Sequence, residues 1–389
     1  MGQAERRPPA SPTMGSGSNS GVVISTSRSW LRMVVPQTGQ SFNSSTMNFS
    51  KRTRVTIREV AAHAGVSIAT VSNVLNGKAQ RATPETVARI QEAVAALGYR
   101  KDVNAAALKT GKSNTVWVLM PRTPGADPLH DGALDSPFFN DFLSGIERGA
   151  SAGHQLINFC RISQLDDLAP IQYGPQPTGV IVMGRYDDEI SAAIRAWDFP
   201  TVIIDNPDFF AAATSANHLN YTIDDRQMGE LAANHLLDLG HRQILLLFGG
   251  LALSPVHQAR YDGAVNACRA RGGDCRLVEA DVSAEGGRRA FAQIATAINE
   301  GVTAVIAMAD VLAIGCYQAA TDAGLHIPEQ FSLVGMDNLR LLEYLPFQLT
   351  TVSQQIIARG FHAVQTLAEG QPLPDLPLQL IAGNTSAAR

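Results

Sequence analysis

The sequence contains little cysteine. Its four cysteines, Cys160, Cys268, Cys275 and Cys316, are scattered, and no two of them have CxxC spacing. A structural zinc site needs about four regularly spaced ligands, and a disulfide scaffold needs a dense cysteine pattern. The composition argues against both, and we interpret the cysteines as buried thiols in a reducing cytoplasm.

Long apolar runs are also missing. The longest, at 244–253, is interrupted by Gly249 and Gly250 and is shorter than the ~18 residues of a membrane-spanning helix. Residues 1–50 are rich in Ser, Gly and Thr and lack the apolar region of a signal peptide. We therefore expect a cytoplasmic protein without a membrane span. The first fifty residues are either a disordered extension or sequence that precedes a translation start at Met47.

Positive charge is scarce over most of the chain, and lysine is absent beyond Lys112. Residues 114–389 hold sixteen basic and thirty acidic side chains, a net charge of −14. Residues 51–113 hold eleven basic and four acidic side chains, a net charge of +7. This asymmetry indicates a small basic module that meets phosphates, joined to a large acidic module that does not bind nucleic acid.

The basic module has the pattern of short helices. Thr56 and Glu59 have the spacing of a capping box, and Gly65 is suited to end the helix that they begin. Ser67 is placed to cap a second helix after this tight turn. A third helix is expected from Thr83 to Gly98, with proline in its first turn.

Beyond Asn114 the pattern changes to short apolar strands separated by helix-length segments. Apolar strands that alternate with helices are typical of parallel sheets covered on both faces. Ligands of such sheets bind beyond the carboxyl ends of the strands. The expected strands are 116–120, 156–159, 179–183, 201–204, 244–248, 304–308 and 332–335. The expected helices include 142–152, 227–239, 258–271, 287–298 and 312–323.

The run TIREVAAHAGVSIATVSNVLNG at 56–77 resembles the helix-turn-helix of the LacI/GalR family of transcription regulators. The resemblance extends from about Val55 to the C-terminus. It continues in TPETVARIQEAVAALGY (83–99), LGHRQI (239–244), RYDG (260–263), SLVGMDN (332–338) and LTTVSQ (349–354).

This resemblance implies the fold class and the domain organisation. The expected fold is an N-terminal all-α helix-turn-helix domain followed by an α/β periplasmic-binding-protein-like effector domain of two doubly wound parallel-sheet subdomains. The expected domains are a disordered extension (1–50), a DNA-binding domain (51–100), a hinge helix or linker (101–113) and a ligand-binding and dimerisation domain (114–389).

In this family the start of the second helix faces bases in the major groove, which here implies base contacts from Ile68, Ala69 and Asn73. An asparagine can both donate to and accept from adenine, whereas small apolar side chains suit thymine methyl groups. For Ile68, a position in the core is the alternative. Phosphate contacts are expected from four hydroxyl side chains, Thr56, Ser67, Thr70 and Ser72.

The segment DVNAAALKTG at 102–111 resembles the family hinge that folds as a short helix on operator DNA. Leu108 matches the leucine that wedges into the minor groove and bends the duplex. Family members often carry arginine where this chain has Ala106, so one backbone contact is expected to be missing. An ordinary alanine-rich linker is the alternative interpretation.

Similarity also implies a ligand in the cleft between the two subdomains, where the family binds mostly sugars, with nucleobases, nucleosides and phosphoprotein partners as exceptions. Arg260 matches an arginine that reaches toward the ligand, and Asp337 matches an acidic residue that accepts protons from ligand hydroxyls or amines. Asp205 follows an expected strand and is the third polar candidate. The remaining candidates are the aromatic pair Phe138 and Phe139 and the polar crossover residue Gln354. The alternatives are that Arg260 and Asp337 pair only with each other and that Phe139 lies in the core.

Two departures from the family pattern reduce the support for a sugar ligand. Ala309 precedes Asp310 where many members have asparagine, so one amide that would bind a hydroxyl is absent. The loop 122–136 is longer than usual. Its His130 and Asp131 are interpreted as solvated residues and not as a metal site or an acid-base pair.

The sequence contains no GxSxG, P-loop, HExxH or strand-linked GxGxxG pattern, so no catalytic residue, metal or cofactor is expected.

One helix-turn-helix reads few bases, and proteins with two-fold symmetry read palindromic sites, so a homodimer is expected. The expected function is a homodimeric repressor whose binding to palindromic operator DNA is controlled by a small sugar-like or nucleoside effector. The alternative is a DNA-binding regulator with a degenerate pocket, controlled by a protein partner or by abundance.

Overall fold

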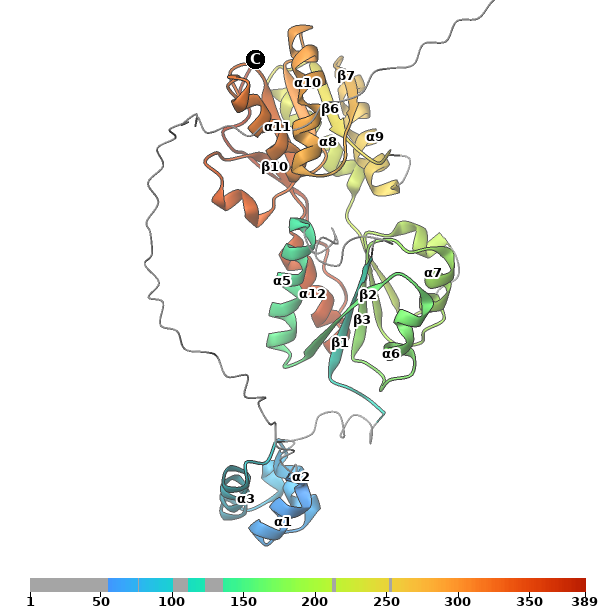
Figure 1. Ribbon diagram of the computed structural model, residues 1–389, viewed down its shortest axis with the longest axis vertical. Coiled ribbons are helices and arrows are strands. Elements are labelled where there is room, and N and C mark those ends of the chain that lie inside the picture. Colours follow the sequence, from blue (N-terminus) through green and yellow to red (C-terminus); the bar gives the residue numbers. More distant parts are fainter. Residues whose placement is uncertain (1–54, 76, 101–110, 123–135, 212–214, 252–253) are drawn as a thin grey trace, which may run out of the picture. The chain divides into compact units, whose positions relative to one another are not determined.

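The computed structural model describes residues 55–75, 77–100, 111–122, 136–211, 215–251 and 254–389 (Figure 1). The chain divides into two compact units, Met1–Tyr99 and Arg100–Arg389, and each is described by itself. Within the described ranges, no helix has the length and apolar character needed to cross a membrane.

The described part of the first unit is helical, and the local signals expected for its helices are confirmed. Thr56 and Glu59 form the capping box, and Gly65 ends the first helix at a φ of 63°. Thr83 caps the third helix, which Gly98 ends at a φ of 61°. The elements are α1 (Ile57–Ala64), α2 (Ile68–Leu75), the 3-10 turn η1 (Ala79–Arg81) and α3 (Pro84–Leu97). Their apolar faces meet in one core of Val60, Ala61, Ala64, Val71, Ile90 and Ala93.

The second unit contains two sheets. The first has the strand order β2-β1-β3-β4-β5, and all of its pairs are parallel. Helices cover both of its faces, with α5 and α12 on one side and α6 and α7 on the other (Figure 1). Its strands are β1 (Thr115–Pro121), β2 (Leu156–Ile162), β3 (Gly179–Met183), β4 (Thr201–Ile204) and β5 (His218–Tyr221). Its covering helices are α5 (Pro137–Ala152), α6 (Ala169–Gln172), α7 (Asp188–Arg195) and α12 (Ile356–Glu369). Short 3-10 turns lie at Leu165–Leu168 and Pro207–Ala211.

The second sheet has the order β11-β10-β9-β8-β6-β7. Its core packs the central strands against helices on both sides. The strands are β6 (Gln243–Phe248), β7 (Asp274–Glu279), β8 (Ala304–Ala307), β9 (Ser332–Asp337), β10 (Thr350–Ser353) and β11 (Gln379–Ile381). The helices are α8 (Asp225–Asp238), α9 (Pro255–Ala270), α10 (Ala284–Asn299) and α11 (Asp310–Asp322), with a 3-10 turn at Arg340–Tyr344.

The expectation of parallel sheets needs one correction. Strand β11 pairs antiparallel with β10, whereas the other strand pairs of this sheet are parallel. A parallel neighbour would require a crossover that brings the chain back to the end of the sheet where β10 begins. After β10 the chain instead passes to the first sheet, forms α12 there, and re-enters the second sheet at the end where β10 stops, so β11 runs in the opposite direction to β10. An antiparallel edge strand on an otherwise parallel sheet is common in large α/β proteins.

Helix α12 comes late in the sequence but completes the first sheet. Its buried residues pack with β1 and α5 in one cluster. The backbones of the two helices approach closely, because a Cβ at Gly145 would collide with the carbonyl oxygen of Ile357 and one at Gly360 with that of Phe142. The chain therefore leaves the first sheet after β5, builds most of the second, and returns.

Candidate functional site

The start of helix α2 presents the residues expected at bases. Ile68 is 44% exposed and Ala69 is exposed, whereas Asn73 is half-buried. Val71 carries the apolar contact of the helix with the core. The exposure of Ile68 argues against the alternative that it fills the core. An exposed apolar side chain in this position suits an apolar base edge such as a thymine methyl group.

The hydroxyl groups expected at phosphates take part in local hydrogen bonds. The Thr56 hydroxyl donates to the Glu59 carboxylate at 2.8 Å. Ser67 Oγ accepts from the Thr70 N–H at 3.0 Å and lies 2.8 Å from the Thr70 hydroxyl. Ser72 is half-buried. A hydroxyl has one hydrogen to donate, so Thr56 must release Glu59 to donate to a phosphate, whereas the Ser67–Thr70 pair retains one hydrogen.

Some expected functional residues lie outside the described residues. These are Leu108 and most of the hinge. His130 and Asp131, interpreted as solvated residues of the long loop, also lie outside the described ranges. The extension 1–50 also lies outside them.

A cavity of about 720 Å³ lies at the carboxyl ends of strands from both sheets of the second unit. Five of the six residues expected at the effector line it, namely Phe138, Phe139, Asp205, Arg260 and Asp337. Gln354 is not among its lining residues; it is buried behind Asp337 and donates to the Asp337 carboxylate at 2.6 Å. The location agrees with the general rule for open α/β sheets.

The strand ends at the cavity have strained backbone. Asp205 has a φ of 48°, Asp337 a φ of 119° and Asn338 a φ of 58°, all in a region that favours glycine. Such strain costs about 1–3 kcal/mol per residue and persists only where the surroundings enforce it. Here it turns two carboxylates away from the strand direction and toward the cavity.

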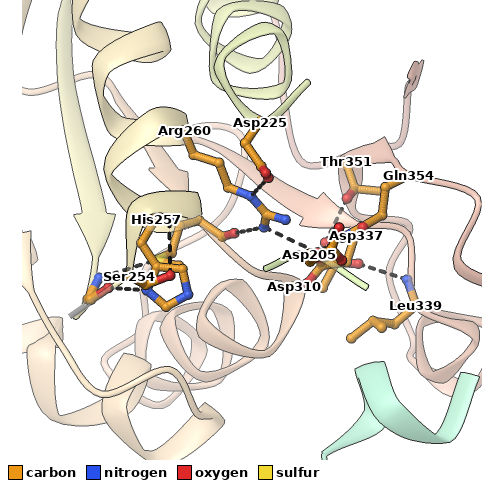
Figure 2. Close-up of polar contacts among 12 residues, drawn as sticks. Asp205, Asp225, Ser254, His257, Arg260, Asp310, Asp337, Leu339, Thr351 and Gln354 are labelled. Carbon is orange, nitrogen blue, oxygen red and sulfur yellow. Dashed lines mark hydrogen bonds and ion pairs between the residues drawn. The ribbon is translucent and has the colours of Figure 1, made fainter. Parts of the chain in front are cut away.

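Arg260 is the centre of the polar corner (Figure 2). Its Nε donates to Asp225 at 2.9 Å, and its Nη1 donates to the Met308 carbonyl at 3.0 Å and to Asp337 at 3.4 Å. All three charged side chains are less than 10% exposed. Although burial opposes the guanidinium charge, Asp225 and Asp337 raise the pKa of Arg260.

The pairing of Arg260 with Asp225 depends on a close contact between helices α8 and α9. A Cβ at Gly263 would collide with the carbonyl oxygen of Arg226, and one at Gly229 with that of Arg260. Glycine at both positions lets the two backbones meet. The glycine of the RYDG motif therefore sets the distance that its arginine spans.

Opposing influences act on the pKa of Asp337. Burial raises its pKa to about 6, whereas Arg260 and the hydrogen bond from Gln354 act to lower it. Its neighbour Asp310 is fully buried, accepts from the Thr351 hydroxyl at 2.7 Å and from the Leu339 N–H at 2.9 Å, and has a pKa raised well above its ordinary value by burial and by Asp337. Burial thus disfavours the charged form of both carboxyls, and Arg260 offsets this effect at Asp337.

This shift predicts a pH dependence of stability. A carboxyl whose pKa is about 6 when folded and about 3.9 when unfolded stabilises the fold at low pH, and this contribution is lost as the pH rises through 6. Relative to Asp337→Asn, the wild type should lose about 1 kcal/mol of unfolding free energy between pH 5 and pH 7. Urea unfolding of both proteins at the two pH values measures it. A difference that stays constant, or that grows with pH in favour of the wild type, would contradict the raised pKa.

The third carboxylate, Asp205, has its own arginine. Arg359 of helix α12 is fully buried and forms a two-pronged pair with Asp205 at 2.6 and 3.1 Å. It also donates to the Gln354 side chain at 2.7 Å and to the Tyr221 carbonyl at 2.8 Å. Its guanidinium lies 5.3 Å from the centre of the Tyr221 ring. Gln354 thus connects Arg359 to Asp337, and the polar network spans both sheets.

Several residues of this network and of the cavity wall were not predicted from the sequence. They are Asp225, Thr351, Arg359 and His257. His257 lines the cavity, and its Nδ1 donates to the Gly249 carbonyl at 2.8 Å. Burial lowers its pKa. A carbonyl only accepts, so Nδ1 carries the proton of a neutral ring.

The sequences of both units match families of known proteins. Residues 56–102 match the family model described as bacterial regulatory proteins, lacI family, and residues 233–379 match that of a periplasmic binding protein-like domain. Catabolite control protein A of Priestia megaterium is 30% identical over 81% of this chain and 92% of its own length.

Two further proteins are similar. The HTH-type transcriptional repressor PurR of Glaesserella parasuis is 28% identical over 81% of this chain and 89% of its own length. The crystal structure of a LacI family transcriptional regulator from Enterococcus faecium with bound ribose is 26% identical, has a TM-score of 0.57, and covers 71% of this chain and 99% of its own. With the helix-turn-helix, the two-sheet unit and these similarities, the chain belongs to the lacI family of bacterial regulatory proteins and is a DNA-binding transcription regulator.

Proposed function

We propose that this regulator is a homodimeric repressor whose binding to a palindromic operator is controlled by a small-molecule effector in the 720 Å³ cavity. The single observation that carries the effector proposal is the buried corner of Asp225, Arg260 and Asp337, which opens into that cavity at the carboxyl ends of the strands. The relative from Enterococcus faecium holds ribose, which supports a sugar or nucleoside class.

The proposal assigns roles to the expected residues. Ile68, Ala69 and Asn73 read bases, and Thr56, Ser67, Thr70 and Ser72 contact phosphates. Leu108 wedges into the minor groove from a hinge at 101–113, between a DNA-binding domain at 51–100 and a ligand-binding and dimerisation domain at 114–389. Phe138, Phe139, Asp205, Arg260, Asp337 and Gln354 serve the effector, with Gln354 acting through Asp337. The protein acts in the cytoplasm and has no catalytic role, in keeping with relatives that are regulators.

Operator binding should depend steeply on salt, because the +7 module at 51–113 displaces counterions from phosphates. If the dimer makes six to ten phosphate contacts, its affinity should fall about 10³- to 10⁵-fold between 50 and 200 mM salt. Gel shifts of the full chain on a palindrome selected from random DNA measure the affinity, and sedimentation gives the number of chains per duplex. Binding that salt leaves unchanged, or one chain per palindrome, would contradict the proposal.

Asn73→Ala should reduce the preference for operator over random DNA by about 1–3 kcal/mol per half-site, because a bidentate contact to adenine is lost. Gln91→Ala, which removes an exposed amide from helix α3, is the matched control and should leave the preference unchanged. Competition gel shifts give both ratios. Equal losses on operator and random DNA would make Asn73 a phosphate contact.

Effector control is tested by thermal shifts of the full chain against a panel of sugars and nucleosides, followed by operator release with each compound that stabilises the protein. Binding to the native state raises the melting temperature by mass action. A compound that both stabilises the protein and changes operator affinity supports the proposal. Operator binding that no compound alters would favour a degenerate pocket controlled by a protein partner or by abundance.

A further inference from the structure

The cations around the cavity are already held by carboxylates. Arg260 contacts Asp225 and Asp337, and Arg359 contacts Asp205. An arginine engaged in this way has less capacity to bind a carboxylate or phosphate from a ligand. An arginine without a carboxylate partner would suit an anionic ligand, but Arg260 of the RYDG motif is already paired, so the structure gives less support to an anionic ligand.

The balance of charge in this corner is negative. Three carboxyl groups, on Asp205, Asp225 and Asp337, face two guanidinium groups, on Arg260 and Arg359. Asp310, beside Asp337, adds no positive charge to this balance, and burial together with Asp337 raises its pKa. The corner therefore has more carboxyl groups than guanidinium groups in a buried setting, and a buried carboxylate is costly until a positive charge or hydrogen-bond donors meet it.

The other polar residues at the cavity do not change this balance. Arg185 is paired with Asp208 at 2.7 Å, on the exposed side. His257 is neutral, since burial lowers its pKa. Among the described residues that line the cavity, every arginine thus contacts a carboxylate.

Most of the remaining wall is apolar. Phe138 and Phe139 pack edge to face, with ring centroids 5.5 Å apart. Met183, Val256 and Met308 line the same cavity. Polar side chains also line the cavity, among them Ser136, Ser254 and Ser283, but a ligand hydroxyl buried against the apolar part of the wall has no partner, and each unpaired buried group costs about 1–3 kcal/mol. An apolar ring gains free energy from the same contact.

Resting on the proposed effector function, we propose that the effector carries no negative charge and has two parts. One is a hydrogen-bond-donating head, an amine or adjacent hydroxyls, that meets Asp205 and Asp337. The other is an apolar body of at least ring size that fills the wall by Phe138 and Phe139. Acidic and phosphorylated compounds are rejected by the surplus carboxylate.

Four simple probes separate the two parts of the proposal. Phenylethylamine, 2-phenylethanol and phenylacetate carry a phenyl ring on a cationic, a neutral and an anionic head, and ethylamine carries the cationic head alone. Dissociation constants with the full chain at pH 7.5 come from ligand-observed NMR titration. Phenylethylamine should bind at least about ten-fold more tightly than phenylacetate and than ethylamine, a factor that corresponds to about 1.4 kcal/mol. The affinity of 2-phenylethanol should lie between those of phenylethylamine and phenylacetate.

Asp337→Asn should remove most of the preference for the amine over phenylacetate, because it removes one negative charge at nearly constant shape. Asp322→Asn, at an exposed ion pair with Arg288, is the matched control and should keep the wild-type order. Phe139→Ala should weaken the three phenyl probes and leave ethylamine unchanged. These readouts are independent, so misfolding of one variant leaves the wild-type order and the other variant as tests.

Phenylacetate binding as tightly as phenylethylamine, ethylamine binding as tightly as phenylethylamine, or no binding of any probe would overturn this inference. Operator release by a phosphorylated sugar would also overturn it, while the proposed function would stand. Failure of the proposed function has a different signature, which is operator binding that no compound of any charge alters.

Discussion

Arg359→Met should destabilise the second unit by about 3–5 kcal/mol, because removing one partner of a buried ion pair leaves the other charge uncompensated. The arginine is fully buried, and its loss leaves the Asp205 carboxylate and the Gln354 amide oxygen without their arginine donor, whereas the Tyr221 carbonyl keeps a backbone hydrogen bond from Asp205. Methionine keeps much of the volume, so the loss reports on polar contacts more than on a cavity. Urea unfolding followed by far-UV circular dichroism measures it.

Arg288→Met is the control for this experiment. Arg288 pairs with Asp322 at a similar distance, 2.8 Å, but both side chains are more than 40% exposed. Exposed pairs contribute about 0–1 kcal/mol, so this variant should unfold close to the wild type. Combining Arg359→Met with Asp205→Asn should recover part of the loss. If Arg359→Met were as mild as the control, the network around helix α12 would not stabilise the fold.

Arg260→Lys should abolish the effector response at ordinary effector concentrations. Lysine keeps the charge, but its single ammonium group lacks the planar fork with which Arg260 reaches Asp225, Met308 and Asp337. With Asp337 no longer held in position, effector affinity should fall by about 2–5 kcal/mol, which is at least about thirty-fold. Operator binding without effector should be unchanged.

The measurement is operator release, titrated with the compound that gives the largest thermal shift in the wild type. Arg271→Lys, at an exposed pair with Asp238, is the matched control. A wild-type midpoint in the Arg260 variant would remove the buried corner from the effector site and leave the cavity to another role.

The sequence predicts the elements whose signals are local. The capping box of Thr56 and Glu59 and the terminating glycines Gly65 and Gly98 define helices without reference to the rest of the chain. The central strands β3 and β4 are apolar except for Thr201, because both of their faces are buried. Strands β5, β7, β10 and β11 were not predicted, since they lie toward sheet edges and mix polar with apolar residues.

The candidate site was predicted where a family motif marks it and missed where only the fold brings residues together. Asp225 lies next to the helix cap Asp224, and an acidic residue in a first helical turn is ordinarily explained by the helix dipole. The sequence pattern could have predicted the burial of Arg359, because Arg359 lies on the same helix face as Ala363 and Leu367 at four-residue spacing. An arginine on an apolar face predicts a buried partner, but not that this partner is Asp205.

The late return of helix α12 has a consequence for synthesis. A ribosome makes the strands of the first sheet and helix α5 well before residues 356–369, yet the cover of the face on which α5 lies is complete only when α12 arrives. Until then α5 alone covers the apolar residues of this face, among them Val116, Val118 and Ile181, and an incompletely covered apolar sheet face promotes association with other chains. A nascent chain that stalls or is cleaved before α12 emerges should therefore be handed to chaperones or aggregate, even though the strands of that sheet are complete.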